Sequence, residues 1–150
     1  MVQRTRVSLP DLYAEDETAW LEEMAGRIAA GEHADLDYAS LGEYLSDMAN
    51  RDRREVFSRL VVLIAHVLKW QHQPDKRSGS WQRTILEQRR ELVGAASKGV
   101  LRRHADDVLA DAYVAAVEDA VIETGLPPDT FPAECPYTFD ELIAFLPTTG

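Results

Sequence analysis

The side chains that could bind a ligand or take part in a reaction are concentrated in residues 60–91, in the segment LVVLIAHVLKWQHQPDKRSGSWQRTILEQRRE. On a helix, residues four and seven positions apart share a face, so His66, Trp70 and Gln73 are predicted to form one stripe. A second stripe of similar character follows Pro74. Together the two stripes and their flanking cations give the candidate ligand or interaction residues His66, Lys69, Trp70, Gln73, Arg77, Trp81, Thr84, Gln88 and Arg89.

Two interpretations of these stripes are kept. In the first, the tryptophan rings pack at the end of a helical hairpin and the polar side chains hydrogen-bond one another or the loop backbone. In the second, Trp70 and Trp81 form the apolar walls of a small-molecule pocket, where Arg77 or Arg89 binds an anion. The structural interpretation is preferred because buried polar side chains normally satisfy one another.

Residues suited to catalysis or metal binding are not brought together by any recognisable motif. Cys135 follows Glu134, whose carboxylate disfavours the thiolate form of the cysteine. His66 and His72 lack the spacing of three or four that places two metal ligands on one helical face. The sequence therefore predicts no catalytic residue, no metal site and no cofactor, and an enzymatic role is left undecided but not favoured.

Charge is divided unevenly along the chain, whose formal net charge is −10. Residues 51–103 contain thirteen Lys or Arg and five acids, whereas the remaining residues contain three Arg and twenty-one acids. Either the acidic flanks neutralise the basic centre, or the basic hairpin 51–103 contacts nucleic-acid phosphates. The first hypothesis is preferred because no helix-turn-helix, zinc or aromatic sheet motif accompanies the cations.

Helical periodicity and capping residues dominate the sequence, and runs of alternating β-branched residues do not occur. Reciprocal capping boxes are predicted at Ser40 with Glu43 and at Thr138 with Glu141, and Ser80 is a predicted cap as well. Gly125 is a predicted helix stop. Helices are expected over residues 12–30, 40–50, 52–73, 80–94, 100–123 and 138–146, with a break at Asn50–Arg51 and a turn at Pro74.

A chain of 150 residues with 45% hydrophobic side chains is long enough to bury one continuous core. The predicted fold is all-α: a single-domain helical bundle of about five main helices over residues 11–150, with a central antiparallel helix hairpin and a short C-terminal helix. Residues 1–10 are candidates for disorder. A single cysteine, a polar N-terminus and short apolar runs predict a cytoplasmic protein without a membrane helix.

Three segments resemble a known family in their order along the chain: LYAEDETAWLEEMAGRI, LVVLIAHVLKWQHQPDKRSGSWQRTILEQRREL and ETGLPPDTFPAECPYTFDELI. The chain resembles the bacterial family called Domain of Unknown Function, number twenty-nine. That resemblance implies an all-helical fold and brings no established activity, although the family pattern includes the candidate residues of the central segment. Gly42 departs from the expected pattern, because glycine costs about 1 kcal/mol relative to alanine within a helix.

The function predicted from these observations is protein–protein interaction, as a homo-oligomer or as a subunit of a larger assembly. Its basis is an acidic exterior, a basic centre and helices with wide apolar faces, which are features of complementary assembly surfaces. Nucleic-acid binding through residues 51–103 is the first alternative. A small-ligand binding protein or enzyme with a pocket near Trp70 and Trp81 is the second.

Overall fold

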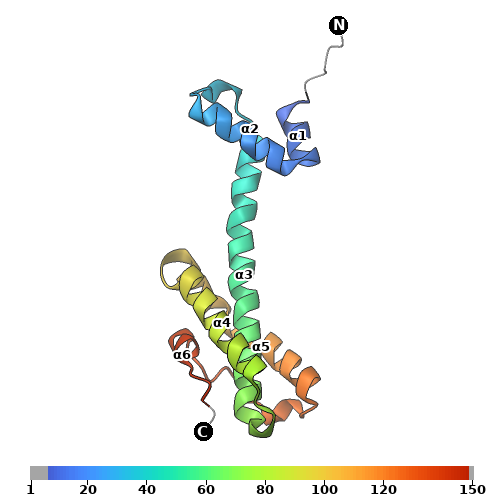
Figure 1. Ribbon diagram of the computed structural model, residues 1–150, viewed down its shortest axis with the longest axis vertical. Helices are drawn as coiled ribbons and strands as arrows, with labels where there is room; N and C mark the ends of the chain where they lie inside the picture. The colour runs from blue at the N-terminus through green and yellow to red at the C-terminus, as the bar shows by residue number, and fades with distance from the viewer. Residues whose placement is uncertain (1–6, 149–150) are drawn as a thin grey trace. The chain divides into compact units, whose positions relative to one another are not determined.

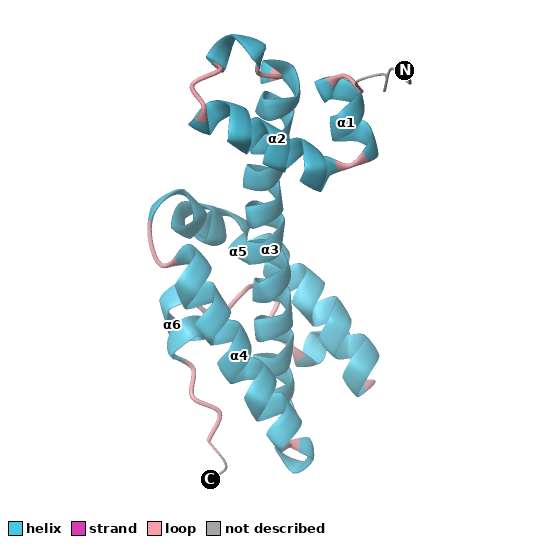
Figure 2. Cartoon of the chain, turned by 45° about the horizontal axis from the view of Figure 1, so that its top comes forward, coloured by secondary structure: helices cyan, strands magenta, loops and turns pink. Residues whose placement is uncertain are grey.

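The computed structural model describes residues 7–148, and every regular element in that range is helical (Figures 1 and 2). The α-helices are α1 (Leu9–Glu15), α2 (Glu17–Ala29), α3 (Tyr38–His72), α4 (Gly79–Ala96), α5 (Gly99–Thr124) and α6 (Phe139–Ala144). Single 3₁₀ turns occur at η1 (His33–Asp35), η2 (Pro74–Lys76) and η3 (Pro128–Thr130). The all-α class predicted from the sequence is confirmed.

The contacts of the chain group into two compact units, residues 1–50 and residues 51–150, called here the N-terminal and C-terminal units. The single domain predicted for residues 11–150 stays a prediction. Of the ten N-terminal residues considered as candidates for disorder, residues 1–6 lie outside the described range. Leu9 and Pro10 form the first turn of α1, which Ser8 caps through its side chain.

Asp16 divides the N-terminal unit where the sequence predicted one helix over residues 12–30, so that prediction is wrong. The backbone of Asp16 leaves helical geometry at φ −151°, and its carboxylate accepts a hydrogen bond from the Ala19 amide at 3.1 Å. Its own amide still donates to the Leu12 carbonyl. One residue thus ends α1 and begins α2, as capping by aspartate permits.

Trp20 is the centre of the N-terminal unit and is fully buried. Its indole Nε1 donates to the Asp37 carboxylate at 3.2 Å, and the ring packs between Tyr13 and Tyr44 at centroid distances of 4.7 and 5.9 Å. Asp37 also accepts from the Ser40 amide at 3.2 Å. It therefore caps the following helix and anchors the tryptophan at the same time.

Helix α3 is continuous over 35 residues, so the predicted break at Asn50–Arg51 and the two separate helices are wrong. The surrounding residues are polar but include no proline or glycine, and a polar helical stretch exposed to water has no reason to stop. The start is also corrected, because Asp37 and not Ser40 caps the helix. The predicted end before Pro74 is confirmed at His72.

Helix caps in the C-terminal unit agree with the sequence at two of three positions. Gly125 ends α5 in the left-handed conformation, at φ +71°, which glycine adopts without strain. Thr138 and Glu141 form the predicted reciprocal capping box at α6. At α4 the predicted cap was wrong, because Ser78 and not Ser80 accepts from the Trp81 amide, at 3.2 Å.

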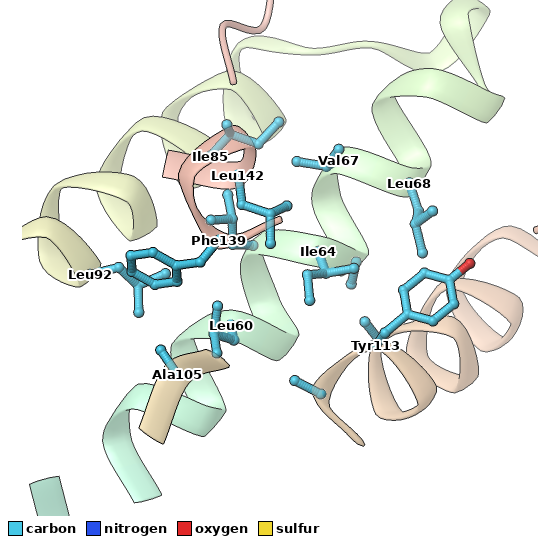
Figure 3. Close-up of a cluster of buried hydrophobic side chains, with 14 of the residues drawn as sticks. Leu60, Ile64, Val67, Leu68, Ile85, Leu92, Ala105, Tyr113, Phe139 and Leu142 are labelled. Carbon is cyan, nitrogen blue, oxygen red and sulfur yellow. The ribbon is translucent and has the colours of Figure 1, made fainter. Parts of the chain in front are cut away.

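The core of the C-terminal unit is built around one face of α3 (Figure 3). Side chains of α4 and α6 lie on one side of α3, where Ala105 of α5 also lies, and Tyr113 of α5 lies on the other side. Six apolar residues at helical spacings along α3 are fully buried: Val56, Leu60, Leu63, Ile64, Val67 and Leu68. On helix α5 the fully buried stripe is Ala105, Ala112, Ala116 and Ala120, whereas Ile122 is 80% exposed. Small side chains allow this close packing.

Candidate functional site

Lys69 links three helices at the centre of the candidate site. It is buried on α3, where its ammonium group forms an ion pair with Glu123 of α5. The same ammonium group lies 5.1 Å from the centre of the Trp81 ring on α4. A buried ammonium group requires such compensation, since an unpaired charge in the interior is strongly disfavoured. The contacts of Lys69 therefore stabilise the packing of α4 and α5 against α3.

Arg77 closes the helical hairpin onto the end of α3. Its Nε donates to the Trp70 carbonyl oxygen at 2.8 Å, and its guanidinium carbon lies 4.9 Å from the centre of the Trp70 ring. Trp70 itself is 3% exposed. The turn at η2 and these contacts make α3 and α4 an antiparallel pair, which confirms the central hairpin predicted from the sequence.

His66 lies on α3 and is partly buried. Its Nδ1 hydrogen-bonds the carbonyl oxygen of Val62 at 2.8 Å, one turn earlier. Burial lowers the pKa of His66 below its ordinary value, and the nearby positive charge of Lys69 acts in the same direction. The Val62 hydrogen bond and the Glu123 carboxylate oppose that shift. The imidazole is therefore biased toward its neutral form.

Two of the remaining candidate residues, Gln88 and Arg89, have partners that lie outside the predicted stripes. Gln88 accepts from Arg59 Nη1 at 3.2 Å, and Arg89 Nε donates to the Ile143 carbonyl at 2.5 Å. Gln73 and Thr84 are partly buried. Within residues 7–148, the side chains of His66, Gln73, Thr84 and Gln88 do not hydrogen-bond one another. The described part of the structure thus does not contain the expected network between the two stripes: His66 hydrogen-bonds within its own helix, and Gln88 hydrogen-bonds to Arg59 of α3.

The sequence did not reveal several ion-pair and hydrogen-bond partners around the candidate residues. Arg59 also pairs with Glu55 at 2.8 Å and with Glu91 at 3.7 Å, and Tyr137 donates to the Gln71 side chain. The one local signal was the spacing of four between Glu55 and Arg59, which favours an ion pair on a helix. The other partners lie far away in the sequence and leave no periodic pattern.

Acidic flanks neutralise part of the basic centre, as the sequence predicted. Lys69 pairs with Glu123, and Arg102 pairs with Asp106 at 3.4 Å and with Asp140 at 3.0 Å. The Arg102 guanidinium also lies 4.2 Å from the centre of the Phe139 ring. These contacts use two cations of residues 51–103 within the C-terminal unit. The Arg102 contacts fix α6 against α5. Both cations are then no longer free to bind an external partner.

Cys135 lies in the segment between η3 and α6, where it is partly buried. Its Sγ donates to the Tyr137 carbonyl at 3.4 Å. Burial raises the pKa of the Cys135 thiol, a shift that the Glu141 carboxylate reinforces and the hydrogen bond opposes. The thiol is therefore poorly suited to nucleophilic attack at neutral pH. No three His, Cys, Asp or Glu side chains of residues 7–148 come together as potential metal ligands.

The outward side of α4 differs from the surroundings of Lys69 and Arg102 in that its arginines form no ion pair with the described residues. Arg83, Leu86, Arg90 and Val93 share this side at spacings of three and four, and we call these four residues the α4 outer face. Leu86 is 37% exposed and Val93 is 45% exposed. Arg83 and Arg90 are exposed and lie more than 4 Å from every carboxylate of residues 7–148. An open hollow runs beside Arg83, Leu86 and Arg90, and Glu87 and Glu91 also line it.

The fold and this surface define an all-helical protein. Cations near its core form ion pairs within the chain, and one helix face exposes arginine and apolar side chains. The chain belongs to the family described as Domain of unknown function DUF29, whose model matches residues 12–146. The resemblance noted in the sequence is thereby confirmed. No curated protein and no solved structure matches the chain. In the described range, no helix combines the length and the apolar content needed to cross a bilayer.

Proposed function

We propose that this protein is a protein-interaction module, acting as an assembly subunit, and that it binds its partner through the α4 outer face. The observation that carries the proposal is the exposure of Leu86, which lies between Arg83 and Arg90, and of Val93, which lies one turn beyond Arg90. The buried centre of an interface is more apolar than the rest of a protein surface, and interfaces are enriched in arginine. The charge of Arg83 and Arg90 remains available to a partner because neither pairs with a described carboxylate.

The two alternatives have less support. A nucleic-acid surface along residues 51–103 would need its arginines free, whereas Arg77 and Arg89 donate to backbone carbonyls and Arg59 and Arg102 pair with acids. A ligand pocket near Trp70 and Trp81 would need open ring faces. Trp70 is 3% exposed, and Lys69 lies over Trp81. We keep the cytoplasm as the proposed compartment, on the basis of the single cysteine.

Photocrosslinking in the native cells tests the proposal. A photoreactive phenylalanine derivative replaces Leu86 in one variant and Ser58, an exposed residue of α3, in the control. We expect a discrete protein adduct at Leu86 that is absent at Ser58. The double variant Arg83→Glu/Arg90→Glu should lose the Leu86 adduct, whereas Arg51→Glu/Arg54→Glu, with the same change in charge, should keep it.

Two results would contradict the proposed function. Absence of any Leu86 adduct would show that the α4 outer face is not covered by a partner. An adduct that nuclease treatment removes would identify nucleic acid as the partner. That result would favour nucleic-acid binding through the basic hairpin 51–103. Circular dichroism of each variant confirms that the helices are intact before the result is interpreted.

A further inference from the structure

Helix α5 has an exposed face with the opposite charge to that of α4. Asp111, Val114 and Glu118 are exposed along it, and we call these three residues the α5 outer face. Val114 is 57% exposed. Beside Val114 lies an open hollow of about 650 Å³, lined mainly by apolar atoms of Val114, Val117, Phe131 and Pro132, with Glu118 and Asp129 among its lining residues. This is an apolar surface with acidic margins.

The two outer faces have matching spacing. Arg83, Leu86 and Arg90 on α4 occupy positions i, i+3 and i+7, and Asp111, Val114 and Glu118 on α5 occupy the same pattern. With a rise of about 1.5 Å per residue, the two charges on each helix are separated by about 10.5 Å along the axis. Aligned helices would bring each arginine opposite a carboxylate and the two apolar residues between them.

Within one chain these faces do not meet. Figure 3 shows Ile85 and Leu92 of α4 on one side of α3 and Tyr113 of α5 on the other. Arg83 and Arg90 accordingly have no ion pair with Asp111 or Glu118, which are themselves unpaired among the described residues. The complementary surfaces are thus available to two different neighbours.

We infer that the partner of the α4 outer face is the α5 outer face of a second copy of this chain. Leu86 of one copy enters the hollow beside Val114 of the next, and Arg83 and Arg90 pair with Asp111 and Glu118 on either side of Val114. This inference rests on the proposed function and names its partner. Because the joined surfaces differ, the contact is head-to-tail, and it produces a ring or an open chain of subunits.

Sedimentation velocity of the purified full-length protein at several concentrations, in low salt, tests the inference. The wild type is expected to form species larger than a monomer, and their fraction should rise with concentration and fall with added salt. Arg83→Glu/Arg90→Glu and Asp111→Lys/Glu118→Lys should each weaken self-association by about tenfold or more, because attraction between the faces becomes repulsion. Arg51→Glu/Arg54→Glu is the matched charge control and should associate as the wild type does.

A mixture of the two charge-reversed variants provides the decisive result. Each variant alone presents like charges at the contact, whereas in the mixture every reversed face meets a face of opposite sign. Equal amounts of the two should therefore associate again. The inference would be overturned if neither variant altered the self-association of the wild type. It would also be overturned if both variants associated weakly and their mixture did not recover.

The result for the wild type also separates this inference from the proposed function. A wild type that stays monomeric at hundreds of micromolar rules out the second copy as the partner. If a Leu86 adduct with a different protein still forms in cells, the α4 outer face remains an interaction surface and only the identity of its partner changes. Helical circular dichroism and an unchanged melting temperature establish that each variant is folded.

Discussion

Arg77 satisfies a carbonyl group of Trp70 that the helix itself leaves without a partner. In α3 this oxygen would accept from the amide four residues later, but that residue is Pro74, which has no N–H. Arg77 Nε supplies the missing donor at 2.8 Å, and its guanidinium group covers the ring of the same tryptophan. The proline that ends the helix and the arginine that follows it thus act together.

Replacing Arg77 with alanine is expected to lower the free energy of unfolding by about 1–2 kcal/mol, since both a hydrogen bond and a cation–π contact are lost. Arg77→Lys keeps the charge without the planar guanidinium group and should recover less than half of that loss. Urea denaturation followed by circular dichroism measures both. Lys76→Ala, at the exposed neighbouring position, is the control and should change stability by less than about 0.5 kcal/mol.

Glu123→Gln is expected to destabilise the protein more than Lys69→Met does. The first change leaves a buried ammonium group without its carboxylate, whereas the second replaces the cation with an apolar side chain of similar length. The double variant should be about as stable as Lys69→Met alone. A double-mutant cycle from urea denaturation gives the coupling, and additive effects of the two changes would show that the pair is not coupled.

His66 should make the stability of the protein depend on pH in the acidic range. Because burial lowers its pKa in the folded state, the unfolded chain binds the proton more readily below the ordinary histidine pKa of about 6.5. Its contribution is complete above that value and is lost as the pH falls toward the folded pKa. The free energy of unfolding of His66→Gln should therefore decrease less than that of the wild type between pH 7.5 and about pH 5.5. Parallel profiles for the two proteins would contradict this role.

Asp37 should determine the local stability of α2. Burial alone would raise its pKa, but hydrogen bonds from Ser40 and from the Trp20 indole outweigh burial and lower it. Asp37→Ala removes the helix cap and leaves the buried indole without its acceptor, a loss of about 1–2 kcal/mol or more. Hydrogen exchange of residues 17–29 should then accelerate about fivefold or more. Asp37→Asn retains an acceptor oxygen and should show a smaller effect; equal rates for the two variants would exclude the cap as the cause.

The choice between Asp37 and Ser40 illustrates what the sequence could predict. Both residues suit a helix cap, but the predicted cap is Ser40, with Glu43 completing a capping box, and Asp37 is not among the predicted caps. Asp37 is used because it also binds Trp20, seventeen residues away, and no local pattern reports that contact. The buried face of α3 was predictable, since it depends only on helical periodicity.

The turn at Pro74 was predictable, but the contacts of the side chains on either side of it were not. In the structure, Lys69 and Trp81 come together across the hairpin. The ion pair of Lys69 with Glu123 joins residues 54 positions apart, and so does the bond from Arg89 to Ile143. Such pairs depend on how α5 and α6 pack on the hairpin, which periodicity does not specify.

The environment of Cys135 has a practical consequence for labelling chemistry. Thiol-reactive dyes attack the thiolate, and burial keeps Cys135 protonated and partly shielded at neutral pH. A cysteine introduced at an exposed position, such as Ser58 on α3, will therefore react with a maleimide dye well before the native thiol does. The natural chain can thus serve as its own background for site-selective fluorophores, without first removing its cysteine.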